Sequence, residues 1–582
     1  MRMYLDPKTC RIRFAPCAFF GTGRGIRAFI LLGLTTLLVQ GCSPLMGSRS
    51  KYMDGQPVTT SPDSWLSDRL HGAHPLSYDA FRVKDSLNPV ISGGPSGASC
   101  GPACQKLRQE FRYVVYVGAQ VYAYASQRDS ETHPDFAALA TQLHASITTQ
   151  TDLRHYQGIL QQWAAAFHNG HVNSLLPSAM TPDSAWVSST PIRLELLAPG
   201  TDHEAIIATA TGATANVAVG DELVQVGALA AMKALEQLLP TISASTDASR
   251  RARAARRLLD TWVDPSPPAN LPLSLTFRHA GNLVKITVAR TPESSPLSGN
   301  ASLNGAATPD FQSALVTAAA GSPTYGYLRV DSFADPAARA SLTQWLDWLG
   351  PTQGWILDLR HNSGGAPVGD AILERLLSSA APMGQSSARV NDFVLAAHPQ
   401  VFPADLTTAE SAAGFTRWQP WVVQPSSQST ATGKLVAVLL GPDCQGACDT
   451  LVAALKQQGL AHLLGETSGG TTGAPLAFDL PASGGQFRYP VVRNEGADGA
   501  TLEGSGTVPD ERIEGTVDEH QQGRDLVLEQ AFEWLSPGTS ALASQVIAQT
   551  GPSWSQSLTI APTRLENERL RRSFGADEWP AP

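Results

Sequence analysis

The residues with the clearest chemical potential follow a predicted buried strand in the second half of the chain. The apolar sequence GWILDLR leads directly into HNSGG. Gly364 and Gly365 then open the next predicted helix, so their backbone N–H groups are exposed at a turn. Paired N–H groups of this kind stabilise an oxyanion. On its own, however, a strand joined to a helix by two glycines is only a tight turn.

Two pairs of cysteines are also candidates for disulfide bonds or for other thiol chemistry. Cys100 and Cys104, and likewise Cys444 and Cys448, are separated by a single helical turn in the sequence. Each pair could close a local disulfide in an oxidising compartment. Free thiols or a zinc cluster are the alternatives, and zinc is disfavoured because no histidine lies beside either pair. We therefore expect no metal and no cofactor.

The first half of the chain contains two segments that differ in their pattern of apolar residues. Residues 93–184 show a helical period, with apolar residues recurring three or four positions apart, and predict a small N-terminal helical domain. Residues 185–292 contain short alternating segments around a helix at 231–238, as is typical of a β-rich module.

The second half reads as an α/β core. Residues 323–536 alternate near-continuous apolar strands with helices, which indicates strands buried on both faces. Residues 293–322 are a predicted linker. The polar C-terminal tail, residues 537–582, lacks a clear period and is expected to lie on the surface or to fray.

The N-terminus carries an export signal. Arg24 and Arg27 precede an apolar run at 28–39 that is too short to span a bilayer, which takes about 20 helical residues. The following VQGC resembles a bacterial lipobox, which implies a lipoprotein signal peptide at 1–41 and lipidation of Cys42. A buried apolar helix is the alternative.

The segment after Cys42 predicts how the protein is attached to the membrane. Residues 42–92 are rich in Ser, Pro and Gly and indicate a flexible tether. Cys42 is followed by Ser43 and not by the aspartate that marks inner-membrane retention in the lipoproteins it resembles. We therefore expect an exported, membrane-anchored protein that faces the periplasm, in the outer membrane.

The charge balance excludes one class of partner. Loss of residues 1–41 leaves 36 basic and 50 acidic residues, a net charge of −14. Such a surface repels phosphate backbones, so we expect no nucleic acid partner.

Several phrases resemble the tail-specific (C-terminal processing) serine protease family. In the family's order these are GYLRVDSFAD, ILDLRHNSGG, VAVLLGPDCQGACDTLVAAL, LLGETSGGTTG and LEGSGTVPDERI. The resemblance runs from the helical domain to Glu533 and implies a crotonase/Clp-like α/β protease core. Within residues 185–292, VAVGDELVQVGALAAMKALEQLL resembles a PDZ phrase, which implies a module that binds an extended peptide at a sheet edge. An uncommitted β-rich spacer is the alternative.

The resemblance assigns the nucleophile position to a glycine. The family's nucleophilic serine begins a phrase like S-A-S-E, and the matching residues here are Gly446-Ala447-Cys448-Asp449. The serine-lysine branch of the family is excluded, because the loop at 469–472 contains no lysine. A thiolate of Cys444 or Cys448 could replace the missing hydroxyl, but a disulfide between them would disarm both.

The tricorn-like and retinoid-binding-protein-like branch of the family fits better. Its catalytic histidine motif matches His171 in NGHV, and its glutamate matches Glu503 in EGSGTVPD, with Glu495 as the nearby alternative. Gly364 and Gly365 would then be the oxyanion donors.

Two functions follow from this assignment. The first is a peptidase that cleaves extended or C-terminal segments of exported proteins with a nucleophile that the sequence does not identify. The second is a catalytically inactive lipoprotein that binds peptides or unfolded protein, or acts as a scaffold. The missing side chain at Gly446 favours the second.

Overall fold

The computed structural model describes residues 2–5 and 12–15 and, between residues 100 and 550, all residues except 125–134, 176–187, 212–213, 215, 260–271, 290, 293–310, 320, 337, 398–406, 408–409, 411–412 and 428–430. The predictions for Cys42, the tether and residues 551–582 therefore lie outside the described residues, as does most of the signal peptide.

Residues Met1–Lys51 form a unit of their own, in which β1 (Arg2–Leu5) pairs antiparallel with β2 (Ile12–Ala15). Everything below concerns the second unit, Tyr52–Pro582. Among the described residues of the chain, no helix combines the length and apolar character needed to cross a membrane.

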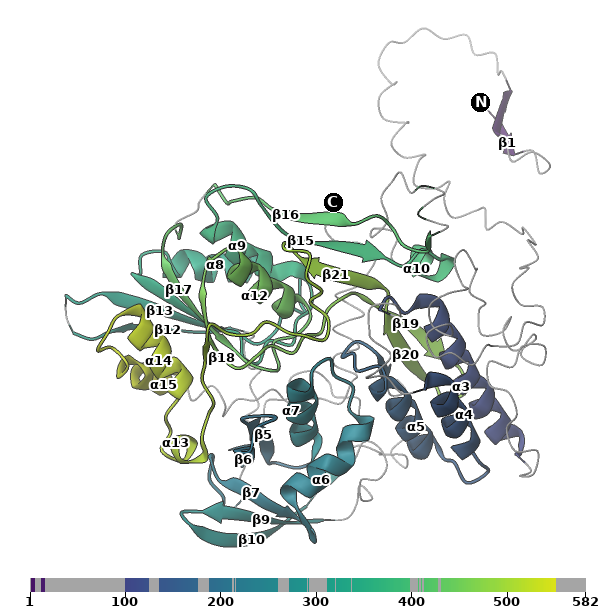
Figure 1. Ribbon diagram of the computed structural model, residues 1–582, viewed down its shortest axis with the longest axis horizontal. Coiled ribbons are helices and arrows are strands. Elements are labelled where there is room, and N and C mark those ends of the chain that lie inside the picture. Colours follow the sequence, from purple (N-terminus) through teal and green to yellow (C-terminus); the bar gives the residue numbers. More distant parts are fainter. Residues whose placement is uncertain are drawn as a thin grey trace. The chain divides into compact units, whose positions relative to one another are not determined.

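The centre of the second unit is a mixed six-stranded sheet (Figure 1). An antiparallel edge strand precedes five parallel strands, in the order β12 (Phe311–Thr317), β13 (Thr324–Val330), β14 (Gly354–Asp358), β17 (Leu435–Leu440), β18 (His462–Gly465) and β22 (Glu511–Arg512).

Helices cover both faces of this sheet, which explains the continuous apolar strands. Side chains such as Trp355 and Val438 pack on one face against α8 (Ala338–Leu349), α9 (Asp370–Leu376) and α12 (Ala447–Gln457). Alternate residues such as Ile356 and Ala437 pack on the other face against α14 (Leu526–Leu535) and α15 (Leu542–Thr550). Within the predicted tail, α15 is thus an ordered helix, because buried Leu542, Ala543 and Val546 anchor it.

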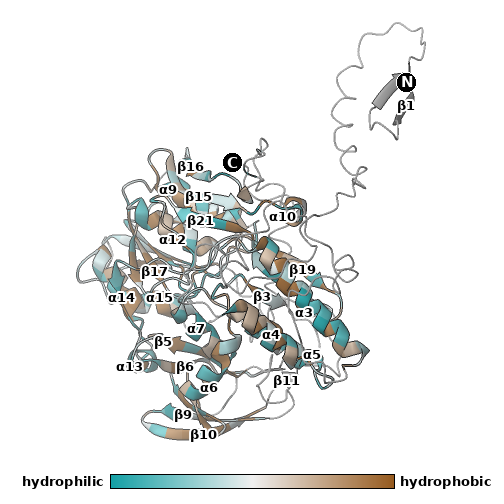
Figure 2. Cartoon of the chain, turned by 45° about the vertical axis from the view of Figure 1, so that its right-hand side comes forward, coloured by the Kyte–Doolittle hydropathy of each residue, from teal (hydrophilic) through white to brown (hydrophobic). Residues whose placement is uncertain are grey.

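The N-terminal helices share a core with a distant part of the chain. They are α3 (Pro102–Val121), α4 (Phe136–Ser146) and α5 (Leu153–Ala165), and they pack on a sheet made of β19 (Pro475–Leu480), β20 (Gly485–Pro490) and β3 (Asn173–Leu175). In Figure 2, α3 carries both hydrophilic and hydrophobic colours along its length, as expected of a helix with one buried face. The predicted helical domain therefore has no separate core of its own.

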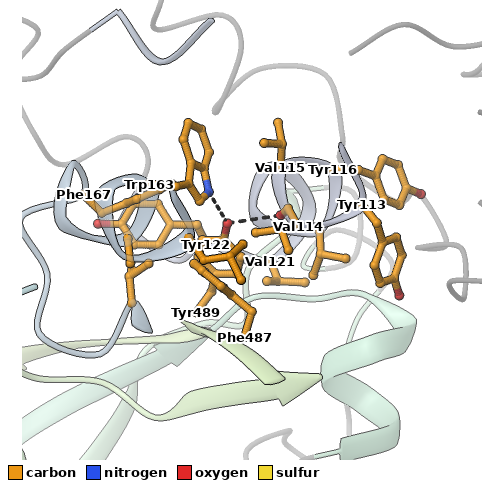
Figure 3. Close-up of a cluster of buried hydrophobic side chains, with 14 of the residues drawn as sticks. Tyr113, Val114, Val115, Tyr116, Val121, Tyr122, Trp163, Phe167, Phe487 and Tyr489 are labelled. Carbon is orange, nitrogen blue, oxygen red and sulfur yellow. Dashed lines mark hydrogen bonds between the residues drawn. The ribbon is translucent and has the colours of Figure 1, made fainter. Parts of the chain in front are cut away.

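Tyr489 is the polar centre of this shared core (Figure 3). Trp163 Nε1 donates a hydrogen bond to the Tyr489 hydroxyl over 2.8 Å, and that hydroxyl donates to the carbonyl oxygen of Val114 over 3.1 Å. Tyr489 also packs on Gly118 so closely that a β-carbon there would lie 2.6 Å from the Tyr489 ring. The tyrosine thereby connects β20 with both α3 and α5.

The β-rich module has a core of its own. Its main sheet runs β10 (Asn282–Val288), β9 (Leu273–His279), β7 (Glu222–Val226), β6 (Ala205–Ala210) and β5 (Arg193–Leu197), with β8 (Leu229–Ala230) paired to β7. Two helices, α6 (Ala231–Leu238) and α7 (Asp247–Arg257), follow β8. The expected helix at 231–238 is therefore present. We refer to residues 188–289 as the insert.

The remaining elements are short. A three-stranded sheet contains β16 (Gln419–Val423), β15 (Ala381–Ala388) and β21 (Val492–Gly496), and β4 (Ser188–Ser189) pairs with β11 (Thr291–Pro292). Two short 3-10 helices are η3 (Leu239–Thr241) and η4 (Pro367–Gly369). Two short α-helices are α10 (Asp392–Ala397) and α13 (Val517–Gln521).

We predict that Tyr489→Phe lowers the free energy of unfolding by roughly 1–3 kcal/mol, because the Trp163 N–H loses its buried acceptor. Urea unfolding would measure the change. Tyr325→Phe is the matched control, since Tyr325 is also buried but its hydroxyl makes no hydrogen bond with a described residue. Equal losses in the two variants would contradict this role of the Tyr489 hydroxyl.

Candidate active site

A sharp turn between β17 and α12 forms the centre of the site. Gly446 is the N-cap residue of α12 and has φ 60° and ψ −120°. This is a left-handed backbone conformation that suits glycine and strains other residues. Cys444 and Cys448 form a disulfide across the turn, and both are fully buried. The turn is therefore a rigid strand-to-helix elbow.

The elbow brings the predicted site residues together. A β-carbon placed on Gly446 would lie 3.8 Å from His171 Nε2, 3.7 Å from Gly364 Cα and 4.0 Å from Gly365 N. Since these are ordinary van der Waals distances, there is space at Gly446 for a small side chain facing His171. Three segments far apart in the sequence thus meet at the elbow.

His171 is held in one tautomer and one orientation. Its Nδ1 lies 2.9 Å from the carbonyl oxygen of Thr472, and its backbone N–H donates to Asn169 Oδ1. Because a carbonyl can only accept, Nδ1 carries the proton and donates it. In the neutral ring, Nε2 is therefore an acceptor that faces Gly446, which is the arrangement of a general base.

Glu503 supports His171 through the backbone of Thr472. Glu503 is buried and accepts the Thr472 N–H over 2.7 Å, while the Tyr124 hydroxyl lies 3.0 Å from Thr472 Oγ1. Thr472 thus links the carboxylate to the imidazole. The alternative residue, Glu495, lies on β21 and accepts from Gln385 Nε2.

The backbone N–H groups beside the elbow differ in their hydrogen bonds. The Gly364 N–H donates to Asn362 Oδ1 over 2.9 Å and is already engaged. In the described part of the chain, no acceptor lies within hydrogen-bond range of the Gly365 N–H or of the Ala447 N–H, the first of α12. Ala447 N also lies beside Gly364, only 3.0 Å from where that residue's β-carbon would be. The Gly365 and Ala447 N–H groups, and not the engaged Gly364 N–H, can therefore donate to a ligand.

Gly364 and Gly365 nevertheless need to be glycines. Their φ values are 78° and 136°, and a β-carbon would lie 2.2 Å from Gln445 O in the first case and 2.4 Å from Phe333 C in the second. Close approach of two backbones is the reason for the double glycine. The sequence signal for Ala447 was its place directly after the elbow residue, where a helix begins with unpaired N–H groups.

None of the alternative nucleophiles is available at the elbow. The alternative of a thiolate beside His171 is excluded, because Cys444 and Cys448 form the disulfide that was the other possibility for this pair. Ser468 Oγ donates to Asp449 and accepts from the Thr507 N–H, and Thr471 Oγ1 lies 3.0 Å from Ser245 Oγ. The second cysteine pair, Cys100 and Cys104, is likewise a disulfide.

Asp449 holds the loop that carries Thr472. Its carboxyl group accepts from the Ser468 hydroxyl and from the N–H groups of Gly470 and Thr471. Burial raises the pKa of Asp449 to about 7. His361, another candidate for the cleft, is buried, and its Nδ1 lies 3.7 Å from Asp443; burial lowers its pKa well below the usual value.

The insert contacts the site directly. Arg256 of α7 forms an ion pair with Asp443, and Gln445 Nε2 donates to Ser249 Oγ over 3.1 Å. On the histidine side, the Gly170 N–H donates to Ser245 Oγ over 2.9 Å. One face of the insert thus supports both the elbow and the loop that carries His171.

The elbow, the imidazole of His171 and the N–H groups of Gly365 and Ala447 thus lie close together, and Gly446 has no side chain there. Residues 324–513 match the sequence model of peptidase family S41. The match lies in the α/β core, and the resemblance to the tail-specific proteases is thereby confirmed.

Two solved structures with TM-scores above 0.5 share the fold. Mature CPAF complexed with lactacystin is similar at a TM-score of 0.59 and 15% identity, over 77% of this chain and 99% of that chain. Mature CPAF gives 0.58 and 15%, over 77% and 98%. The photosystem II D1 C-terminal processing protease gives 0.38 and 15%, over 71% and 93%. The comparison with curated protein sequences gave no match.

We predict that Asp449→Asn removes a pH dependence of stability. The folded pKa of Asp449 is about 7, above its ordinary value of about 3.9, so its contribution to stability is complete below about pH 4 and is lost as the pH rises through about 7. The free energy of unfolding of the wild type should therefore fall relative to that of the variant across this range.

Urea unfolding between pH 4.5 and 7.5 would measure this difference. Asp479→Asn, on an exposed position of β19, is the control and should parallel the wild type. A constant difference between wild type and Asp449→Asn would contradict the raised pKa.

Proposed function

We propose that this protein is a peptide-binding member of peptidase family S41 that does not cleave what it binds. One observation carries the proposal: a β-carbon built on Gly446, which we assign to the nucleophile position, lies 3.8 Å from His171 Nε2, and Gly446 offers no hydroxyl or thiol there. Without an attacking atom at the elbow, no acyl-enzyme intermediate can form.

The groups that would hold a peptide carbonyl are still in place. The Gly365 and Ala447 N–H groups lie beside the elbow, and the α12 N-terminus adds its partial positive charge. The family match supports a peptide or unfolded protein as the ligand. Binding and cleavage are separable here because they depend on different atoms.

The insert supplies a second candidate surface for the ligand. We assign it a PDZ-like role, supported by its phrase GDELVQVG, by β5 at the edge of its sheet and by α7 packed beside that strand. An extended peptide would add to such an edge by backbone hydrogen bonds. We also propose that the α/β core is of the crotonase/Clp-like type.

The proposed location is the periplasmic side of the outer membrane, with a lipid anchor at Cys42. The signal-like N-terminus supports export, and the two disulfides fit an oxidising compartment. The long segment between Cys42 and the first described helix would act as the tether.

Peptide hydrolysis is the second candidate function, and the retained base arrangement of His171, Thr472 and Glu503 is the observation in its favour. It would require a nucleophile from outside the elbow, whereas the described hydroxyls and thiols next to it are already engaged. We therefore favour binding without cleavage.

We predict that Gly446→Ser gains reactivity toward a fluorophosphonate probe, because the new hydroxyl would lie within reach of His171 Nε2. Gly446→Ala and the wild type should stay unlabelled. The double variant Gly446→Ser with His171→Gln should lose most of the labelling, by about 10²–10⁴-fold, since the base is removed. Labelling of the wild type, or its hydrolysis of casein, would overturn the proposal that the protein does not cleave peptides.

We also predict that Cys42→Ser moves the protein from the membrane fraction to the soluble fraction of the exporting cell, since the proposed lipid attachment site is removed. Fractionation and immunoblotting would measure this. Cys17→Ser, in the part removed with the signal peptide, is the control. An unchanged membrane fraction for Cys42→Ser would contradict the anchor.

A further inference from the structure

Two arginines share one aromatic ring on the small sheet of β16, β15 and β21 (Figure 1). The guanidinium carbons of Arg389 and Arg493 lie 4.8 and 4.1 Å from the centre of the Phe415 ring, and that of Arg493 also lies 4.8 Å from the centre of the Trp418 ring. Cation–π attraction accounts for each contact. It does not account for two like charges at a single ring.

The sheet register also makes the two arginines neighbours. Arg493 is opposite Ser387 in the antiparallel pair of β21 and β15, and Arg389 follows Ser387 by two residues. Residues opposite each other, and residues two apart on a strand, point to the same face. Arg493, Phe415 and Trp418 are each partly exposed, so this arginine cluster reaches the protein surface.

Neither guanidinium has an acidic partner. Among the described residues neither arginine forms an ion pair, and the one hydrogen bond of the Arg389 side chain runs from Nε to the carbonyl oxygen of Gln120, over 3.3 Å. Glu495, two residues along β21 from Arg493, accepts from Gln385 Nε2. In this part of the chain, the two terminal nitrogens of Arg389 and the buried Nε of Arg493 therefore have no acceptor.

Burial makes this arrangement unfavourable unless an anion completes it. Arg389 is only 5% exposed, and a charge taken out of water without a paired charge costs free energy. Burial and the charge of Arg493 lower the pKa of Arg389 to about 10. Burial also lowers the pKa of Arg493, although Glu495 and Tyr124 act in the opposite direction. Both groups are still cations at neutral pH, on a protein whose overall charge is negative.

The arginine cluster lies next to the loop that positions His171. Gly473 of this loop packs so closely on β21 that a β-carbon there would lie 2.2 Å from the carbonyl oxygen of Val492, the residue before Arg493. The residue before Gly473 is Thr472, whose carbonyl oxygen accepts from His171 Nδ1. Since an extended peptide advances about 3.3 Å per residue, one bound beside His171 needs only a few residues to reach this strand.

We infer that Arg389 and Arg493 bind an acidic side chain, Asp or Glu, of a bound peptide. A carboxylate supplies two oxygens in one plane, which match the planar donor forks of guanidinium groups. It also brings a negative charge to two cations that otherwise repel each other. No covalent bond forms or breaks, and both partners keep their charges. This inference rests on the proposed peptide-binding function and names the chemical class of its ligand.

A peptide library tests the inference. N-acetylated, C-terminally amidated decapeptides of mixed sequence, free of other acidic residues, are made in two sets that carry either one Glu or one Gln. Blocking both ends removes the terminal charges, so the sets differ only in this side chain. The peptides are captured by the immobilised protein and quantified by mass spectrometry. We expect at least about tenfold higher retention of the Glu set, the scale of a hydrogen bond to a charged group.

Arginine variants show where the acidic side chain binds. Arg493→Gln and Arg389→Gln should each bring retention of the Glu set to within about twofold of the Gln set. Arg524→Gln is the matched control, because it removes the same charge from an arginine that already pairs with Glu529, and it should keep the preference. Arg493 is partly exposed, so Arg493→Gln decides the test even if the buried Arg389→Gln fails to fold.

Thermal unfolding gives a second readout that a structural role would not produce. Arg493→Gln relieves the repulsion between the two cations, so its Tm should be no lower than that of Arg524→Gln. A retained Glu peptide should raise the Tm of the wild type and leave that of Arg493→Gln unchanged. A lower Tm for Arg493→Gln, with equal peptide-induced shifts in both proteins, would assign the arginine to the fold and overturn the inference.

Inorganic phosphate separates a peptide site from a site for a free anion, because it offers similar oxygens without a peptide. At equal concentration, the Glu peptide should raise the wild-type Tm more than phosphate does. Stabilisation by phosphate that Arg493→Gln abolishes, without any preference for Glu peptides, would show that a free anion fills the arginine cluster and would overturn the peptide assignment.

The outcomes distinguish this inference from the proposed function. Equal retention of both peptide sets by the wild type overturns the acidic-side-chain assignment and leaves peptide binding intact. A preference that survives Arg493→Gln also overturns it, since the carboxylate is then bound elsewhere. Retention of neither set overturns both proposals.

Discussion

The backbone conformation at Gly446 is the constraint on which the rest of the cleft depends. Glycine tolerates many conformations, so the residue itself does not select φ 60° and ψ −120°. Its surroundings impose them: the Cys444–Cys448 disulfide closes the turn, and the Gly446 N–H donates to the carbonyl oxygen of Thr471 over 2.7 Å. Because the turn is fixed, the first N–H of α12 has a defined position relative to His171.

The other half of the site depends on buried carboxyl groups that act through the backbone. Asp449 and Glu503 accept N–H groups of the loop from Gly470 to Thr472, and Thr472 in turn positions His171. Burying a carboxyl group costs free energy unless donors replace water. The loop supplies those donors, so its conformation and the burial of the two acids depend on each other.

The sequence predicted the parts of the fold that have a strong local signal. The buried strands and the helices at 231–238 and after Gly446 appear as expected, because continuous apolar runs and helical periods reflect local burial. The helix α15 was missed, since its buried residues Leu542, Ala543 and Val546 are few and lie in a mostly polar segment. Likewise, no local pattern could show that α3 and α5 share a core with β20 through Tyr489.

The sequence named residues that the structure brings close together, but it did not predict the hydrogen bonds that connect them. His171 and Gly446 could be found because each lies in a short phrase, whereas the route from Glu503 to His171 passes through a backbone unit of Thr472 that any residue type could provide. For the same reason, the sequence could not show that the Ala447 N–H, and not the Gly364 N–H, is available as a hydrogen-bond donor. The Asn362 side chain occupies the Gly364 N–H, and only three-dimensional structure reveals such competition.

The elbow also shows why a glycine can preserve a peptidase cleft. A serine in this left-handed conformation would be strained by on the order of 1–3 kcal/mol, and the surrounding structure would have to hold it there. Glycine removes that strain together with the nucleophile, while the disulfide and the loop contacts keep the turn in place. The free space then lies between an imidazole and two N–H donors.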